Sequence, residues 1–166
     1  MSAARCPLAE FRVGTAFDAH RLVTGRPLVL GGILIPHASG LDGHSDADIV
    51  CHALIDAILG AACMEDIGTH FPPHDPAWKD ARSIELLALA WGRVTAAGWS
   101  LVNCDAFVTL QQPKIATYRD GMRAAVARAL DCDLDRVSIR ATTTDGLGFT
   151  GRGEGAACQA VAMLTR

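Results

Sequence analysis

The 166-residue sequence lacks several signatures that mark other classes of protein. It has no run of lysine or arginine and carries a net charge of −3, which argues against a nucleic-acid partner. It has no stretch of about 18 uninterrupted apolar residues, so we predict no transmembrane helix and no membrane partner. Residues 1–11 show no basic segment followed by an apolar block, so we expect no secretory signal.

The six cysteines form no C-x-x-C pair, which argues against a cysteine-based zinc site. Most of them lie in apolar runs, and we interpret them as reduced, buried, small hydrophobic residues. Together with the missing secretory signal, this predicts a cytoplasmic protein.

Charged residues make up only 20% of the chain, whereas 50% of its residues are hydrophobic. Little polar surface is therefore available to cover a lone monomer, which favours an oligomer that buries apolar surface between subunits. An alanine-rich core is the alternative explanation. The length fits a single domain over residues 1–166, in which we expect residues 1–10 to be an N-terminal extension without fixed structure.

Hydrophobic periodicity and turn residues predict an order of elements that does not alternate regularly between strand and helix. The expected elements are strands at 12–20 and 27–35, helices at 45–63 and 83–97, a strand at 100–110, a helix at 118–130, and strands at 137–144 and 156–164. Residues 65–79 read as a long loop, where binding functions are common. No G-x-G-x-x-G follows a strand. We predict an α+β fold, a mixed β-sheet with helices packed on one face.

A candidate metal site combines a carboxylate with two imidazoles. Asp18 and His20 are two apart on a predicted strand and therefore share a face, and His52 lies within a predicted helix. This donor set suits a zinc-like ion with one open position. Asp48 and Asp56 flank His52 by four residues, so one of them is expected to orient its imidazole. On spacing alone, a buried and hydrogen-bonded core histidine explains His52 equally well.

Two segments are candidates for binding phosphate. His44 and Ser45 stand at the predicted start of a helix, where Ser45 is expected to be the N-cap and free N–H groups favour an anion. The glycine-rich block 141–155 offers hydroxyls, Asp145 for a Mg²⁺ ion and Arg152 for a phosphate. The alternative for this block is a threonine-rich strand and a flexible turn in which Arg152 pairs with Glu154.

Motifs spread over residues 11–164 resemble those of the 2-C-methyl-D-erythritol 2,4-cyclodiphosphate synthase family. They are Phe17-Asp18-Ala19-His20-Arg21-Leu22, Gly25-Arg26-Pro27-Leu28, Gly40-Leu41, Gly43-His44-Ser45-Asp46-Ala47-Asp48, Asp66-Ile67-Gly68, Phe71-Pro72, Asp75-Pro76, Pro113-Lys114 and the block 141–155. The resemblance implies a homotrimer of α+β subunits with active sites between neighbours. It also implies a metal-dependent lyase that converts 4-diphosphocytidyl-2-C-methyl-D-erythritol 2-phosphate to the cyclic diphosphate and CMP in the non-mevalonate isoprenoid pathway.

The resemblance assigns roles to individual residues. It places zinc, or another divalent ion, on Asp18, His20 and His52, and a Mg²⁺ or Mn²⁺ ion with the substrate diphosphate, for which Asp145 is the candidate ligand. His44 and Thr143 match transition-state stabilisers. The implied substrate contacts are Asp18, His20, His44, Ser45, Asp66, Ile67, Gly68, Phe71, Asp75, Leu110, Lys114, Ile115, Ala116, Ala141, Thr142, Thr143, Thr144, Asp145, Phe149 and Arg152.

The sequence departs from the family pattern at two places. Asp145 stands where the family usually has glutamate, so the charge is kept but its reach is one methylene shorter. The loop Phe71-Pro72-Pro73-His74-Asp75 replaces a family loop with two carboxylates, and Pro73 takes the place of one of them. We expect this loop to be stiffer than its counterparts.

Two other functions compete with the cyclase. A zinc phosphohydrolase would use the same open metal position to generate a hydroxide and would release free phosphate. A trimeric binding module would hold isoprenoid diphosphates in a central cavity near Phe149 and Arg152. The intact set of Asp18, His20 and His52 argues against a purely binding role.

Overall fold

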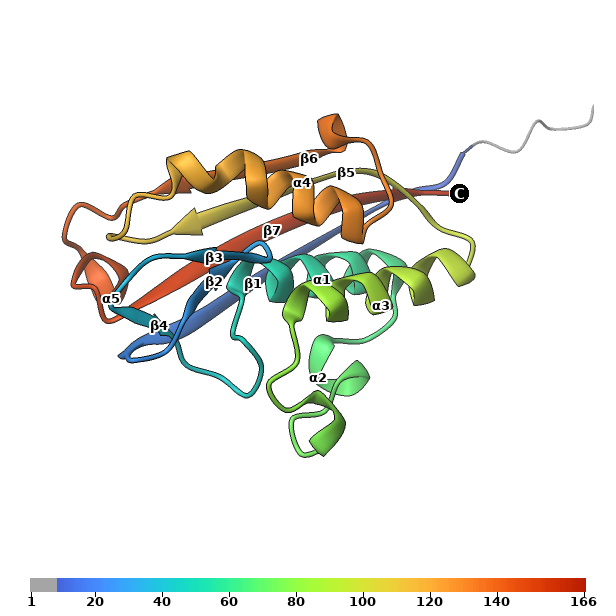
Figure 1. Cartoon of the computed structure of the whole chain (residues 1–166). Helices are drawn as coiled ribbons and strands as arrows, with labels where there is room; N and C mark the ends of the chain where they lie inside the picture. The colour runs from blue at the N-terminus through green and yellow to red at the C-terminus, as the bar shows by residue number, and fades with distance from the viewer. Residues whose placement is uncertain (1–8) are drawn as a thin grey trace, which may run out of the picture.

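A mixed sheet forms the centre of the computed structural model, which describes residues 9–166 (Figure 1). Within that range the sheet has the strand order β4-β1-β7-β5-β6. Its strands are β1 (Phe11–Thr24), β4 (Ser39–Leu41), β5 (Ser100–Thr109), β6 (Val137–Thr142) and β7 (Gly155–Thr165). The β5–β6 pair is parallel and the other pairs are antiparallel, so the predicted mixed sheet is confirmed.

Helices α1 (Ile49–Ala62), α3 (Ser83–Ala96) and α4 (Arg119–Ala129) cover one face of this sheet, as predicted (Figure 1). Strand β7 shows why, because Cys158, Ala160 and Ala162 alternate with the exposed Gln159 and Val161. The buried set is small, so the helices can approach the sheet closely. On the opposite face, Phe11, Val13 and Phe17 of β1 and Val161 of β7 are exposed.

Several boundaries differ from the prediction. The segment 27–35 is a hairpin of β2 (Leu28–Leu30) and β3 (Ile33–Ile35), because Gly31 and Gly32 both take positive φ and turn the chain. The predicted loop 65–79 contains a short helix. The remaining elements are α2 (Ile67–His70), α5 (Gly148–Gly151) and the 3-10 turns η1 (Pro76–Trp78), η2 (Ala116–Tyr118) and η3 (Leu134–Arg136).

The start of α1 corrects a second expectation. Ser45 is not its N-cap, because Ala47 adopts a left-handed conformation (φ 56°) that interrupts a helical path from Ser45. The cap is the buried Asp48, whose carboxylate accepts from the backbone N–H groups of Val50 and Cys51. The free N–H groups expected beside His44 and Ser45 therefore lie further along the chain and are used internally.

Residues 1–8 of the expected N-terminal extension lie outside the described residues. Glu10, at its end, exchanges two backbone hydrogen bonds with Arg166 and so joins the two ends of the described chain. No helix within residues 9–166 is long and apolar enough to cross a membrane.

Candidate functional site

Asp18, His20 and His52 meet in the structure, as the sequence predicts. Asp18 and His20 point to the helix side of β1, and His52 reaches them from the first turn of α1. Asp18 Oδ2 lies 3.2 Å from His20 Nε2 and 3.1 Å from His52 Nδ1. All three side chains are partly buried, so they stand at the wall of a hollow and not in the core.

The hydrogen bond behind His20 fixes which of its nitrogens faces Asp18. His20 Nδ1 contacts the backbone carbonyl oxygen of Asp42, which can only accept. In the neutral ring Nδ1 therefore carries the proton, and Nε2 turns a lone pair towards the Asp18 carboxylate. Two electron-rich atoms that face each other need a cation between them, either a second proton on the ring or a metal ion.

The donor set fits a divalent metal ion. Zinc bonds of roughly 2.0–2.1 Å in tetrahedral geometry place neighbouring donor atoms about 3.3 Å apart. The two separations from Asp18 Oδ2, 3.1 and 3.2 Å, are close to that spacing. One carboxylate and two imidazoles leave a fourth position for an oxygen of another molecule.

Electrostatics at this group also favour a cation. Burial raises the pKa of the Asp18 carboxyl, but hydrogen bonds that the protonated rings of His20 and His52 would donate outweigh it, so the pKa lies well below its usual range. The hydrogen bond to Asp18 is the main reason that the pKa of His20 is raised. Asp56 follows His52 by one turn of α1, and burial raises the pKa of its carboxyl. Asp18 therefore stays negative at the point where a metal ion would bind.

A hollow of about 260 Å³ opens beside the candidate metal ligands. Its lining includes predicted residues from β1, the loop before α1, α1 itself and α2: Asp18, His20, His44, Ser45, His52, Ile67, Gly68 and Phe71. Asp66 and Asp75 do not line it, because their carboxylates cap α2 and η1. The substituted Pro73 does line it, together with Trp78 and Leu86, which no sequence motif indicated.

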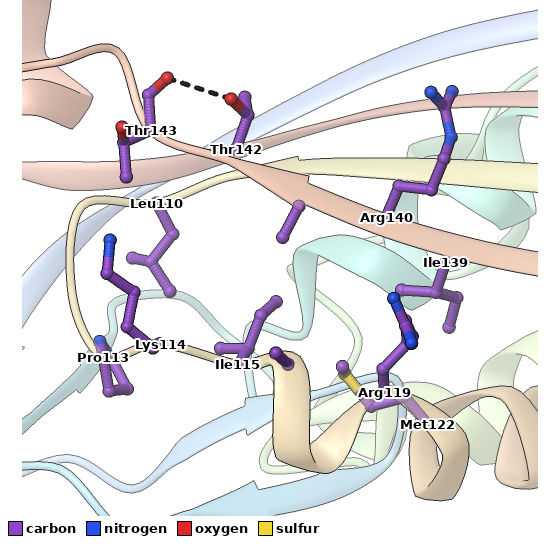
Figure 2. Close-up of a pocket in the computed structure, with 12 residues that line it drawn as sticks. Leu110, Pro113, Lys114, Ile115, Arg119, Met122, Ile139, Arg140, Thr142 and Thr143 are labelled. Carbon is purple, nitrogen blue, oxygen red and sulfur yellow. Dashed lines mark hydrogen bonds between the residues drawn. The ribbon is translucent and has the colours of Figure 1, made fainter.

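A second hollow, of about 280 Å³, lies between the end of β6 and the segment before α4 (Figure 2). Predicted residues that line it are Leu110, Lys114, Ile115, Ala116, Ala141, Thr142 and Thr143. Figure 2 shows Thr142 and Thr143 across the hollow from Lys114 and Ile115. Among residues 9–166, the linings of the two hollows have no residue in common. Within one chain, the candidate metal ligands and Thr143 therefore lie at two separate hollows.

The remaining residues of the glycine-rich block bond mainly to one another. Asp145 has positive φ (50°) and accepts a 2.9 Å hydrogen bond from Thr143 Oγ1. Thr144 Oγ1 lies 2.9 Å from the hydroxyl of Thr150. Arg152 pairs with Glu154 at 2.7 Å, which is the pairing that the alternative interpretation expected. Phe149 lines a small hollow beside His20.

The carboxylates flanking His52 do not orient its imidazole, contrary to the prediction. Asp48 caps α1, and Asp56 accepts a 2.7 Å hydrogen bond from the backbone N–H of Ile67. His52 Nε2 meets two hydroxyls instead, those of Ser45 at 3.1 Å and Ser83 at 2.9 Å. The spacing of residues along one helix could not indicate Ser83, because Ser83 belongs to α3, which packs against α1.

The sequence of this chain matches a known protein family and its members over nearly its whole length. The YgbB family profile matches residues 11–165. A 2-C-methyl-D-erythritol 2,4-cyclodiphosphate synthase of Geobacillus kaustophilus (strain HTA426) is 53% identical over 156 residues, which cover 94% of this chain and 99% of the relative.

Solved structures show the same likeness. The bifunctional IspDF of Campylobacter jejuni matches with a TM-score of 0.92 and 42% identity over 96% of this chain, which spans 43% of that longer protein. A CDP-bound 2C-methyl-D-erythritol-2,4-cyclodiphosphate synthase matches with a TM-score of 0.85 and 37% identity, over 92% of this chain and 99% of that one. With its family profile, its half-identical relative and its fold in agreement, this chain belongs to the YgbB family.

Proposed function

We propose that this chain is a 2-C-methyl-D-erythritol 2,4-cyclodiphosphate synthase, a metal-dependent lyase. It converts 4-diphosphocytidyl-2-C-methyl-D-erythritol 2-phosphate to the 2,4-cyclodiphosphate and CMP, a step of the non-mevalonate isoprenoid precursor pathway. The observation that carries this proposal is the preformed donor set of Asp18, His20 and His52, in a chain that matches such synthases along nearly its whole length.

The reaction joins two groups that repel each other. An oxygen of the 2-phosphate attacks the β-phosphorus, the bond from that phosphorus to the bridging oxygen breaks, and CMP leaves with the electron pair. A bound divalent ion supplies Lewis-acid charge to the phosphoryl oxygens. Asp18, His20 and His52 would hold that ion, and His44 is exposed at the rim of the same hollow, where it can donate to phosphate oxygens.

The second hollow is proposed as the nucleotide end of the site. Its floor is apolar, with Leu110 and Ile115, and its rim carries Lys114 and the hydroxyls of Thr142 and Thr143. A flat base suits the apolar floor, and the cation and hydroxyls suit a phosphate. Relatives with bound CDP support this class of ligand.

We further propose a homotrimer in which each substrate spans two chains. Two observations support it. The metal hollow and the nucleotide hollow are separate within one chain. The sheet face opposite the helices exposes large apolar side chains, among them Phe11, Val13 and Phe17, which a neighbouring subunit would cover.

We propose zinc at the three-ligand site and Mg²⁺ or Mn²⁺ with the substrate diphosphate. Nitrogen and oxygen donors with one open position suit zinc. Asp145 is exposed at the edge of the nucleotide segment and carries the charge that a second ion needs, although it is tied to Thr143 in this structure. A cytoplasmic location is also proposed, supported by the free thiols of the described cysteines at positions 51, 63, 104, 132 and 158.

An assay with the purified chain, the cytidine diphosphate substrate, Zn²⁺ and Mg²⁺ tests the proposal. We expect CMP and the cyclic diphosphate in equal amounts, detected by ³¹P NMR. Chelation of the metal, or His52→Ala, should abolish both products while the chain stays folded by circular dichroism. Release of free inorganic phosphate would indicate the phosphohydrolase instead. Nucleotide binding without turnover would leave only the binding module.

A further inference from the structure

A chain of hydrogen bonds runs from His52 away from the metal position. His52 Nε2 lies 2.9 Å from Ser83 Oγ, at the start of α3. Ser83 Oγ donates in turn to Asp46 Oδ1 at 2.5 Å, in the loop before α1. The same Asp46 oxygen accepts the backbone N–H of Ser83 at 3.1 Å. The loop, α1 and α3 are therefore linked at one point behind a metal ligand.

Counting the protons along these hydrogen bonds gives the tautomer of His52. A serine hydroxyl has one proton, and an ionised carboxylate can only accept. Because Ser83 gives its proton to Asp46, its oxygen must accept from His52, so Nε2 carries the imidazole proton. His52 Nδ1 is then left with a free lone pair, and Nδ1 is the atom that lies 3.1 Å from Asp18. This is the tautomer that a metal ion at Asp18 requires.

Among the described residues the Ser83 hydroxyl has one further contact, with Ser45 Oγ at 3.2 Å, and that oxygen belongs to the same group around His52. The residue is fully buried and lines neither hollow among the described residues, so it does not reach a substrate. The N-cap position of α3 belongs to Arg82, which makes no capping bond with its side chain. Ser45 differs, because its oxygen accepts from the backbone N–H of Ala47 and it faces the metal hollow.

We propose that Ser83, held by Asp46, is a positioning residue that fixes the tautomer and orientation of His52 for the divalent ion. The inference rests on the metal site of the proposed function and assigns to Ser83 and Asp46 a role that sequence motifs did not indicate. Partners of this kind typically raise metal affinity by about 10- to 100-fold.

Metal binding by the full chain, with Zn²⁺ or Co²⁺ alone, tests the role without any turnover. We expect Ser83→Ala to weaken Zn²⁺ binding by roughly 10- to 100-fold in competition with a chromophoric chelator. The visible absorption bands of bound Co²⁺ should also shift, because the imidazole loses its fixed direction. Ser83→Thr keeps the hydroxyl and should restore affinity and spectrum. Asp46→Ala should weaken binding as Ser83→Ala does, since the serine proton is then free to point at His52.

Thermal unfolding of the metal-free variants separates positioning from packing. If Ser83→Ala lowers the melting temperature but leaves Zn²⁺ affinity and the Co²⁺ spectrum unchanged, the inference is overturned and Ser83 is structural. Equal loss of affinity in Ser83→Thr and Ser83→Ala would also overturn it. A wild-type chain that binds Zn²⁺ normally but releases no CMP contradicts the proposed function and leaves this inference standing.

Discussion

At the scale of single residues, Asp145 combines the charge that a second metal ion needs with a short side chain. Its carboxylate is turned inwards onto the hydroxyl of Thr143, at 2.9 Å. The left-handed backbone at Asp145 (φ 50°) suits aspartate better than most residues, because its side chain bonds locally. The shorter acid is therefore consistent with the local turn, while its reach towards a diphosphate is reduced.

We predict that Asp145→Glu is tolerated or activating. The longer side chain restores reach to an ion on the diphosphate, so the Mg²⁺ concentration for half-maximal rate should stay the same or fall. Asp145→Ala, the control, removes the charge and should raise that concentration at least roughly tenfold, equivalent to an ion contact of about 1.4 kcal/mol. The measurement is the rate of CMP release against Mg²⁺ concentration. A large loss of activity in Asp145→Glu would show that the shorter acid is required.

At this scale the sequence predicted the candidate metal ligands but not the residues that contact them. Asp18 and His20 were predictable because a strand places every second side chain on one face. His52 rested on resemblance, since a helix position alone fits a core histidine as well. The contact of Ser83 with His52 depends on how α1 packs against α3, and the contact of the Asp42 carbonyl with His20 depends on how the chain turns after β4. No spacing along the chain carries that information.

At the scale of elements, the position of α1 depends on the absence of a side chain at Gly14. A Cβ there would lie 2.0 Å from the backbone oxygen of Ala57 and 2.5 Å from the backbone nitrogen of Ala61. Helix α1 therefore touches β1 directly. That contact sets the distance between the strand that carries Asp18 and the helix that carries His52.

We predict that Gly14→Ala lowers the free energy of unfolding by about 1–3 kcal/mol or more, because the clashing atoms are backbone and the helix must move. The matched control is Gly60→Ala in α1, where an added Cβ meets nothing within 4 Å. That change should stabilise by roughly 0.5–1 kcal/mol through helix propensity. Urea denaturation of the metal-free chain measures both. Equal stability of Gly14→Ala and wild type would contradict the close approach.

Long periodic elements were the predictable part of the fold. The helix expected at 83–97 and the strand expected at 100–110 match α3 and β5 closely. The failures have local causes: a two-glycine turn splits 27–35 into a hairpin, and Ala47 stops a helix from starting at Ser45. The four residues of α2 are too few to show a helical period.

At the scale of the whole molecule, the open face of the sheet is the feature that one chain leaves unexplained. Phe11, Val13 and Phe17 on β1 are more than half exposed, and Val161 on β7 lies on the same face. Arg140 stacks 4.7 Å from the ring of Phe107 and pairs with Asp105, so charge is neutralised on this face. An apolar and largely neutral surface of this kind fits burial against other copies of the chain.

We predict that Val13→Asp separates the proposed trimer into monomers, because a carboxylate would be buried without a partner between subunits. Val13 is 65% exposed in one chain and points away from the metal ligands, so zinc binding and folding should persist. CMP release should be lost, since no neighbour then supplies the nucleotide hollow.

The control is Leu89→Asp on the outer side of α3, which should remain trimeric and active. Sedimentation reports the mass against three times the 17.5 kDa chain. A fully active Val13→Asp monomer would contradict the shared site, and a monomeric wild type would contradict the trimer.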